Sequence, residues 1–242
     1  MRVLVTGGAK RLGAAIARAV AAAGHEVVIH YGTSRDAAEA LARELGGTTV
    51  AGDLAETNKL PDLFARAGGG RPIDGLVNSA SLFEYDAPVA IDAALAARLH
   101  SVNCVAPAML TAALAAQGGE GAVVNLLDQK LANPNPDFFS YSLSKYALEG
   151  ATTMLAQAFA PRVRVNAVSP GLTLPSGDQS AAEFDRVARA NLLERPVGAE
   201  AVAAAVVYLL EARSVTGQNL FVDCGQRFLA RDGDVMFEDR DA

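Results

Sequence analysis

The chain contains little cysteine and little histidine. Its 242 residues include two cysteines, Cys104 and Cys224, and three histidines. The cysteines are far apart in the sequence and lack the spacing of a metal-binding motif. We therefore predict no metal site and expect free thiols in a reducing cytoplasm. The histidines (His25, His30 and His100) are scattered, and we assign none of them a role.

The sequence also lacks a basic block and a long apolar run. With 21 basic and 27 acidic residues, the net charge is −6. Nucleic acid and an anionic membrane are therefore not expected as partners. The longest uninterrupted apolar stretch, Ala201–Leu210, is too short to span a bilayer. Met1–Gly7 leads directly into a strand-like segment, without the apolar region of a secretion signal.

Short apolar, β-branched runs alternate with alanine-rich helical patterns along the whole chain. We predict strands at residues 3–5, 26–30, 48–51, 75–78, 122–127, 162–168 and 219–222. We predict helices at residues 12–23, 35–45, 59–66, 91–116, 141–159 and 200–212. Strands that are nearly continuously apolar, such as 122–127, are typical of parallel sheets covered on both faces. The pattern predicts an α/β fold, with a doubly wound parallel sheet of about seven strands in one domain, residues 1–242.

In such sheets ligands bind at the carboxyl ends of the strands, and polar and glycine residues cluster there in this sequence. The segment Thr6–Gly13 joins the first strand to the first helix. Its glycines allow a tight turn, and the start of the helix attracts phosphate. This context favours a cofactor-phosphate site over a purely structural turn. The residues of this turn that we predict to bind cofactor are Gly7, Lys10, Arg11 and Leu12.

The end of the second predicted strand bears on the choice between NAD and NADP. An acidic residue there would bind the ribose hydroxyl of NAD, but no carboxylate precedes Asp36. Ser34 and Arg35 can instead hold a 2′-phosphate, helped by Lys10 or Arg11. Arg35 as a solvated residue in the first turn of a helix is the alternative. NADP(H) is the predicted cofactor.

Two further strand ends carry candidate cofactor residues. Asp53, which precedes Leu54, can accept a hydrogen bond from the adenine amino group, or it can cap a helix. The segment Asn78-Ser79-Ala80 can line the cofactor cleft, or it can be a plain turn.

The segment Tyr141-x-x-x-Lys145 carries the most specific chemical information. Residues four apart on a helix share one face, so a phenol lies beside an ammonium. A neighbouring cation favours the phenolate form and lowers the pKa of the tyrosine. Asp128 stands thirteen residues upstream. These groups can exchange a proton with a substrate.

The chain resembles the short-chain dehydrogenase/reductase family along essentially its whole length. The residues that carry the resemblance are Thr6-Gly7 with Gly13, Asp53-Leu54, Asn78-x-Ala80, Asn103, Tyr141-x-x-x-Lys145 and Pro170-Gly171. The resemblance implies a Rossmann-type oxidoreductase in which Tyr141 donates a proton. It also implies that Lys145 lowers the pKa of Tyr141 and holds the nicotinamide ribose.

Three positions depart from the family pattern. Arg11 stands at the usual middle glycine of the phosphate turn, Ser79 at a usual asparagine, and Asp128 at the usual serine. That serine would hydrogen-bond a substrate carbonyl, whereas an ionised aspartate would repel it. Asp128 therefore argues against ordinary carbonyl reduction.

The chain is similar to one branch of this family, the pteridine reductases. The similar residues are Thr6–Gly13, Asn78-x-Ala80-Ser81-x-Phe83, Asp128 and Pro170-Gly171-Leu172. The resemblance implies that Phe83 stacks on a flat pterin and that Ser81 and Arg11 contact pterin and cofactor phosphate. Asp128 and Tyr141 would supply protons. Core packing for Phe83 and a turn role for Asp128 remain open alternatives.

Asn103 can have a role of its own in proton transfer. Pro107 lacks the N–H that would bond the carbonyl of Asn103 in a helix, so this carbonyl can hold a water that relays protons to Lys145. A buried proline kink without function is the alternative. The segment 172–194 is expected to be a substrate lid. The tail 226–242 carries Phe228, Arg231, Met236 and Phe237 among charged residues. The family resemblance implies a homotetramer in which this tail approaches a neighbouring subunit, and fraying is the alternative.

The favoured hypothesis is an NADPH-dependent reductase of a pterin or a similar flat heterocycle, that is, of a small-molecule substrate. The alternatives are a family member that acts on a ketone or alcohol, and a catalytically silent NADP-binding sensor.

Overall fold

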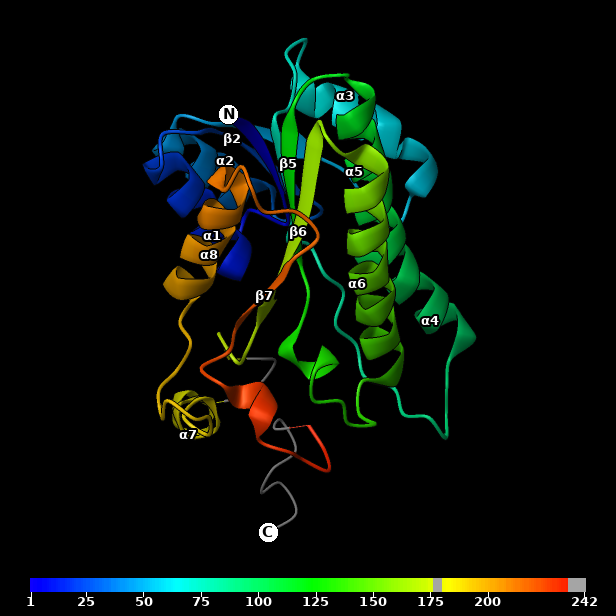
Figure 1. Cartoon of the computed structure of the whole chain (residues 1–242), viewed down its shortest axis with the longest axis vertical. Coiled ribbons are helices and arrows are strands. Elements are labelled where there is room, and N and C mark those ends of the chain that lie inside the picture. Colours follow the sequence, from blue (N-terminus) through cyan, green and yellow to red (C-terminus); the bar gives the residue numbers. More distant parts are fainter. Residues whose placement is uncertain (176–179, 235–242) are drawn as a thin grey trace.

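Seven parallel strands form one sheet in the computed structural model of the chain, which describes residues 1–175 and 180–234 (Figure 1). The strands are β1 (Arg2–Thr6), β2 (Glu26–Tyr31), β3 (Thr48–Ala51), β4 (Gly75–Asn78), β5 (Gly121–Leu126), β6 (Val163–Pro170) and β7 (Asn219–Val222). Their order in the sheet is β3-β2-β1-β4-β5-β6-β7. The predicted fold class is confirmed, and each predicted strand is present with ends shifted by at most two residues.

Burial of the strands follows their place in the sheet. β1 and β4 are in the middle of the sheet, and all their residues are buried. The edge strands β3 and β7 are only partly buried. Continuous apolar runs are needed only where helices cover both faces of a strand, which is why the central strands were the easiest to recognise.

Helices cover both faces of the sheet. The main helices are α1 (Arg11–Ala22), α2 (Arg35–Leu45), α3 (Leu60–Gly68), α4 (Ala93–His100), α5 (Ala106–Ala116), α6 (Phe139–Phe159), α7 (Ala181–Ala188) and α8 (Ala199–Glu211). Short turns of helix are η1 (Thr57–Lys59), η2 (Ser101–Val105), η3 (Gln129–Leu131) and η4 (Gln226–Phe228). α1, α2 and α8 pack on one face, and α3, α5 and α6 on the other, with α4 against α6 (Figure 1).

The strand order reverses between β1 and β4. The chain runs outward from β1 to β3, returns past β1 to β4, and then continues outward to β7. Loops that follow β1 and β4 therefore leave the sheet on opposite sides of one gap. This gap at the carboxyl ends is where α/β sheets bind ligands.

The predicted helix 91–116 is divided in the structure. It begins at Ala93 because the Asp92 side chain accepts hydrogen bonds from the first N–H groups of α4 and caps it. Its middle, η2, is a π-helical turn in which the Ala106 N–H bonds the carbonyl of Ser101, five residues back. Pro107 has no N–H, so the regular ladder cannot continue there. The structure thus has a π-helical turn within the predicted helix, where the sequence predicted regular α-helix.

One helical run among the described residues, Ala93–Ala116, has the length and hydropathy of a membrane-spanning helix. Polar residues interrupt this run, so it does not contain a long uninterrupted apolar stretch. Buried helices of sheet proteins meet the same criteria, and 44% of the most apolar window of this run is buried in the protein. The run is therefore weak evidence for a membrane span.

The segment predicted as a lid contains a helix. α7 begins with a capping box, in which the Ser180 hydroxyl accepts from the Glu183 N–H and the Glu183 carboxylate accepts from the Ser180 N–H. This signal was present in the sequence as Ser-x-x-Glu. Residues 176–179 of the lid, and residues 235–242 of the tail with Met236 and Phe237, lie outside the described residues.

Candidate active site

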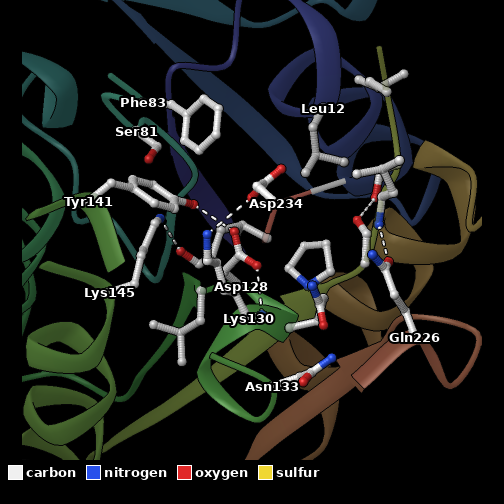
Figure 2. A pocket seen from close by; sticks show the side chains of 18 of the residues that line it. Leu12, Ser81, Phe83, Asp128, Lys130, Asn133, Tyr141, Lys145, Gln226 and Asp234 are labelled. Atoms are coloured by element: carbon white, nitrogen blue, oxygen red, sulfur yellow. Dashed lines mark hydrogen bonds and ion pairs between the residues drawn. The ribbon is translucent and has the colours of Figure 1, made fainter. Parts of the chain in front are cut away.

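A cavity of about 320 Å³ lies at the carboxyl ends of the strands (Figure 2). The predicted site residues that line it are Arg11, Leu12, Ser79, Ser81, Phe83, Asp128, Tyr141, Lys145, Pro170 and Gly171. The predicted residues that are not part of its lining are Gly7, Lys10, Ser34, Arg35, Asp53, Leu54, Asn78, Ala80 and Asn103. The structure thus brings the predicted catalytic and substrate residues together, apart from Asn103.

Tyr141, Lys145 and Asp128 meet at one side of this cavity. The Tyr141 hydroxyl donates a hydrogen bond to Asp128 Oδ2 over 2.8 Å. Lys145, one turn further along α6, donates to the carbonyl of Leu126 at 2.8 Å, and its Nζ lies 5.7 Å from the centre of the Tyr141 ring. The predicted convergence of a phenol, an ammonium and a carboxyl is therefore present in the geometry.

Local folding explains this arrangement. Asp128 follows the last residues of β5, and its Oδ1 accepts from the Lys130 N–H at 2.9 Å, which caps η3. It is thus both a turn residue and a member of the cavity wall. The start of α6 is fixed because Ser140 donates through its N–H and its hydroxyl to the buried carboxylate of Asp86. Hydrogen bonds therefore fix both the segment that carries Asp128 and the start of α6, which carries Tyr141 and Lys145.

Burial alters the acidity of all three groups. Desolvation raises the pKa of Asp128, although the bonds from the Lys130 N–H and Tyr141 oppose the change. Desolvation and the Asp128 carboxylate raise the pKa of Tyr141 well above its ordinary value. Desolvation lowers the pKa of Lys145 to about 8. The net shift of the Tyr141 pKa is therefore upward, because burial and the neighbouring carboxylate dominate. The expected lowering contribution of Lys145 stays a prediction.

Asn103 holds the cavity wall together through its side chain. It is fully buried in η2, its Oδ1 accepts from the Leu82 N–H at 2.8 Å, and its Nδ2 donates to the Leu82 carbonyl at 2.9 Å. Nδ2 also donates to Ser144 Oγ on α6 at 3.0 Å. Asn103 therefore ties the loop of Ser81 to the helix of Tyr141. The proposed relay through its carbonyl stays a prediction.

Phe83 lines the cavity within an aromatic cluster. Its ring stacks on Phe138 with 4.1 Å between the ring centres, and Tyr141 meets it edge to face at 4.7 Å. Phe138 is buried and has a left-handed backbone, φ 52°, just before α6. Phe83 itself is 42% exposed. Phe83 thus packs on Phe138 and Tyr141 while part of its side chain stays exposed. Its contact with a pterin stays a prediction.

The turn between β1 and α1 is shaped for a phosphate group. A Cβ added at Gly13 would collide with the carbonyl of Gly7, and Gly7 itself has φ 62° and lies against Ala80. Thr6 Oγ1 accepts from the N–H groups of Ser79 and Ala80 at 3.0 and 3.1 Å, which joins this turn to the loop after β4. This tight turn, which has no side chains at Gly7 and Gly13 and lies at the start of a helix, fits a dinucleotide phosphate.

Arg11 occupies an unusual backbone position in this turn. Its φ is 52°, in the left-handed region that glycine adopts without steric cost. This backbone conformation explains why the family usually has a glycine at this position. Its guanidinium lines the cavity and donates to the carbonyl of Pro175 at 2.6 Å. Arg11 is thus positioned between the phosphate turn and the segment that follows β6.

His30, which received no role from the sequence, supports the same turn. It is buried at the end of β2, its Nδ1 accepts from the Gly7 N–H at 3.2 Å, and its Nε2 lies 3.1 Å from the Gly52 carbonyl. A neutral ring protonated on Nε2 satisfies both contacts. The sequence signal was weak, since only the pairing of β1 with β2 brings these residues together.

Stability is therefore expected to fall as pH drops from 6.5 to 4. Desolvation lowers the pKa of His30 to about 4, so in this range the unfolded chain binds a proton that the folded chain does not. The loss amounts to about 3 kcal/mol once both pKa values are passed. Chemical unfolding at several pH values measures it. A His30→Gln variant should lose this part of the pH dependence, and an unchanged profile would contradict the assignment.

The remaining predicted cofactor residues lie around the ends of β2, β3 and β4. Ser34 and Arg35 begin α2, and the exposed Arg35 guanidinium is 3.6 Å from Glu39. Asp53 Oδ1 accepts from the Ala55 N–H at 2.9 Å within a turn, so Asp53 does not cap a helix, and its contact with adenine stays a prediction; Leu54 is buried in the core. Lys10 is exposed at the start of α1.

Asn78 belongs to a buried chain of polar groups. Its Nδ2 donates to Asn125 Oδ1 at 2.8 Å, and Asn125 Nδ2 donates to Thr152 Oγ1 on α6 at 2.9 Å. The Oδ1 of Asn78 has no hydrogen-bond partner within residues 1–175 and 180–234. Such an orphaned acceptor beside the cofactor turn fits a site that a bound group completes.

Several residues of the cavity could not be identified from the sequence. Lys130 and Asn133 follow Asp128, whereas Gln226, Arg231 and Asp234 belong to the end of the chain. Gln226 Oε1 accepts from the Leu172 N–H at 2.8 Å and thereby fixes the segment after Gly171. No motif marked these positions, because their role depends on a contact between distant parts of the chain.

Comparison with known proteins identifies the class. The model of the family described as enoyl-(acyl carrier protein) reductase matches residues 7–227. The chain also shares 32% identity and a TM-score of 0.83 with a structure described as a short-chain dehydrogenase/reductase family protein, over 95% of this chain and 98% of the other. The chain belongs to the short-chain dehydrogenase/reductase family and is an oxidoreductase.

Similar proteins within this family include reductases of pterins. A crystal structure of FolM alternative dihydrofolate reductase 1 from Brucella suis in complex with NADP is 40% identical, with a TM-score of 0.91 and coverage of 95% of this chain and 96% of that one. Pteridine reductase 1 of Leishmania tarentolae is 31% identical, with coverage of 92% and 94%. L-xylulose reductase of Bos taurus is 33% identical, with coverage of 95% and 96%.

Proposed function

We propose that the protein is an NADPH-dependent reductase of a pterin-like C=N bond. The observation that carries this proposal is the hydrogen bond of 2.8 Å between the Tyr141 hydroxyl and Asp128. Two proton-bearing groups then face the cavity, and both have raised pKa values. The similarity to pteridine reductase 1 and to the NADP-bound FolM reductase supports the same assignment.

Reduction of a C=N bond requires a hydride at carbon and a proton at nitrogen. Bound NADPH supplies the hydride. Tyr141 is proposed to deliver the proton, and Asp128 to replace it along the hydrogen bond or to serve a second nitrogen directly. A donor works best when its pKa is near the operating pH, and burial moves the pKa of Asp128 upward in that direction. Lys145 keeps a positive charge beside the ring of Tyr141.

A ketone substrate is less compatible with this site. The oxygen of a ketone becomes negatively charged during reduction, and Asp128 would repel it whenever this carboxyl is ionised, whereas the serine usual in the family is never charged. A ring nitrogen that gains a proton has no such conflict. Phe83 and Ser81 are proposed to hold the flat ring, because both line the cavity and Phe83 is partly exposed.

The 2′-phosphate of NADPH is proposed to lie at the start of α2. Arg35→Ala is then expected to raise KM for NADPH about 10- to 100-fold, the size of one charge-assisted hydrogen bond. Arg43→Ala, in the last turn of the same helix, is the matched control and should leave KM unchanged. Steady-state kinetics with varied NADPH provide the measurement. Equal effects of the two variants would place the phosphate elsewhere.

The direct test is NADPH oxidation with dihydrobiopterin, dihydrofolate and a panel of ketones that includes L-xylulose. The proposal predicts turnover of a pterin with kcat/KM well above that of any ketone. Preference for a ketone would favour the function named for L-xylulose reductase. Binding of NADPH with no turnover of any compound would favour a sensor.

The proposal includes assembly as a homotetramer and a cytoplasmic location. Light scattering of the purified protein tests the first, and fractionation of cells tests the second.

A further inference from the structure

We propose that Lys130 and Asp234 are positioning residues of the active site: their ion pair closes the substrate end of the cavity and sets the charge that Asp128 faces. Neither residue belongs to the proton-transfer set described above. This inference rests on the proposed function only for the role of Asp128 as an acid. The ion pair itself, and its effect on Asp128, are independent of the substrate.

Lys130 is a buried cation at the centre of the cavity wall, with 5% of its surface exposed. Its Nζ donates to the carbonyl of Asp137 at 2.6 Å and to Asp234 Oδ2 at 3.1 Å. It also lies 5.5 Å from the centre of the Phe138 ring, which carries the stack with Phe83. Figure 2 shows the Lys130 and Asp234 side chains converging on the space beside Asp128 and Tyr141. One ammonium therefore connects the segment of Asp137 and Phe138 with Asp234 in the cavity wall.

Asp234 reaches this place because the end of the described chain is attached at several points. Asn133 Nδ2 donates to the Leu229 carbonyl at 2.6 Å, and Arg231 donates to the carbonyl of Ala190 at 3.1 Å. The Asp234 N–H donates to Asp137 Oδ2 at 2.8 Å. These bonds fix residues 229–234 across the cavity, so the carboxylate of Asp234 is a constant feature of the wall rather than a surface charge.

The ion pair is placed to control Asp128. A lysine this deeply buried needs a counter-charge, and Asp234 supplies it. Desolvation is the main cause of the raised pKa values of Asp128 and Tyr141, and the negative charge of Asp234 adds a smaller increase to both. The Lys130 ammonium offsets part of that charge, while its backbone N–H holds Asp128 Oδ1. Removal of either charge should therefore change the proton affinity of Asp128, in opposite directions.

Other charges around Asp128 stay constant in this comparison. Within residues 1–175 and 180–234, the titratable and charged groups that face it or line the same cavity are Tyr141 and Lys145 of α6, Arg11 of α1, Lys130 of η3, and Arg231 and Asp234 of the segment 229–234. Asp137, which accepts from the Asp234 N–H, lies behind the pair.

The experiment is a charge cycle read on Asp128 itself. The protein is labelled with ¹³C at its aspartate carboxyl carbons, and the resonance absent from Asp128→Asn is titrated in the wild type, Asp234→Asn, Lys130→Met and the double variant. We expect the midpoint to move to lower pH in Asp234→Asn, to higher pH in Lys130→Met, and to return toward the wild-type value in the double variant. Asp232→Asn, an exposed neighbour in the same segment, should not shift it.

Opposite shifts that cancel are expected only if charge acts on Asp128, whereas a purely structural role would move both midpoints in the same direction or neither. An unchanged midpoint in Asp234→Asn would overturn the proposal. If Lys130→Met does not fold, Asp234→Glu decides, because restoring the charge should restore the midpoint. Since no substrate enters these titrations, lack of pterin turnover would refute the proposed function and leave this inference standing.

Discussion

Replacement of Tyr141 by phenylalanine is expected to lower kcat for pterin reduction about 10²- to 10⁴-fold, the usual contribution of a positioned proton donor. The variant removes only the hydroxyl, so the ring still packs edge to face on Phe83. Asp128 loses the hydrogen bond that opposes its raised pKa and should become harder to ionise. Stopped-flow measurement of NADPH oxidation, with KM for NADPH determined separately, tests the expectation.

A matched control is available on the same helix. Tyr146 also ends in a hydroxyl that bonds a backbone carbonyl, that of Leu131 at 2.9 Å, and it lies outside the cavity. Tyr146→Phe should leave kcat within about twofold of the wild type. A substitution outside the cavity that removes a single hydrogen bond usually has only a small effect. If the two variants lose activity equally, the loss comes from α6 as a whole and Tyr141 is not the donor.

Much of the fold was readable in the sequence because it depends on local pattern. The strand Gly121–Leu126 is almost entirely apolar, with Asn125 as its one polar residue, and burial on both faces favours that composition. The pair Tyr141 and Lys145 was equally clear, since four-residue spacing on a helix fixes their proximity whatever surrounds them. Features set by a single element and its period could therefore be predicted.

Features that depend on distant partners could not be predicted. The raised pKa of Tyr141 results from burial and from Asp128, neither of which spacing reveals. His30 supports the phosphate turn only because β1 and β2 pair, and Asp234 reaches Lys130 only because residues 229–234 fold back over the cavity. The helix α7 is different. Its capping box at Ser180 was visible, and the expectation of a lid obscured it.

Asp128→Asn is the second variant for which a large effect is expected, a loss of about 10²-fold or more in kcat for a pterin. The two Asp128 oxygens each accept one hydrogen bond, from Tyr141 and from the Lys130 N–H. An asparagine offers one oxygen, and the backbone N–H must have it because it can only donate. The amide nitrogen then donates to the Tyr141 hydroxyl, which becomes an acceptor. The variant thus loses one acid and reverses the hydrogen bond of the other.

The same substitution should stabilise the fold at neutral pH. Burial raises the pKa of Asp128, so above its ordinary value the unfolded chain releases this proton more readily than the folded chain, and stability falls as pH rises. An asparagine has no proton to release, and its advantage in Tm should therefore be absent near pH 4 and grow toward pH 8. Thermal unfolding across this range, together with NADPH oxidation, measures both effects. If the variant is slower but no more stable at pH 8, then ionisation of Asp128 does not destabilise the folded protein, and its pKa is not raised by burial. The acid role would then have to be assigned to Tyr141 alone.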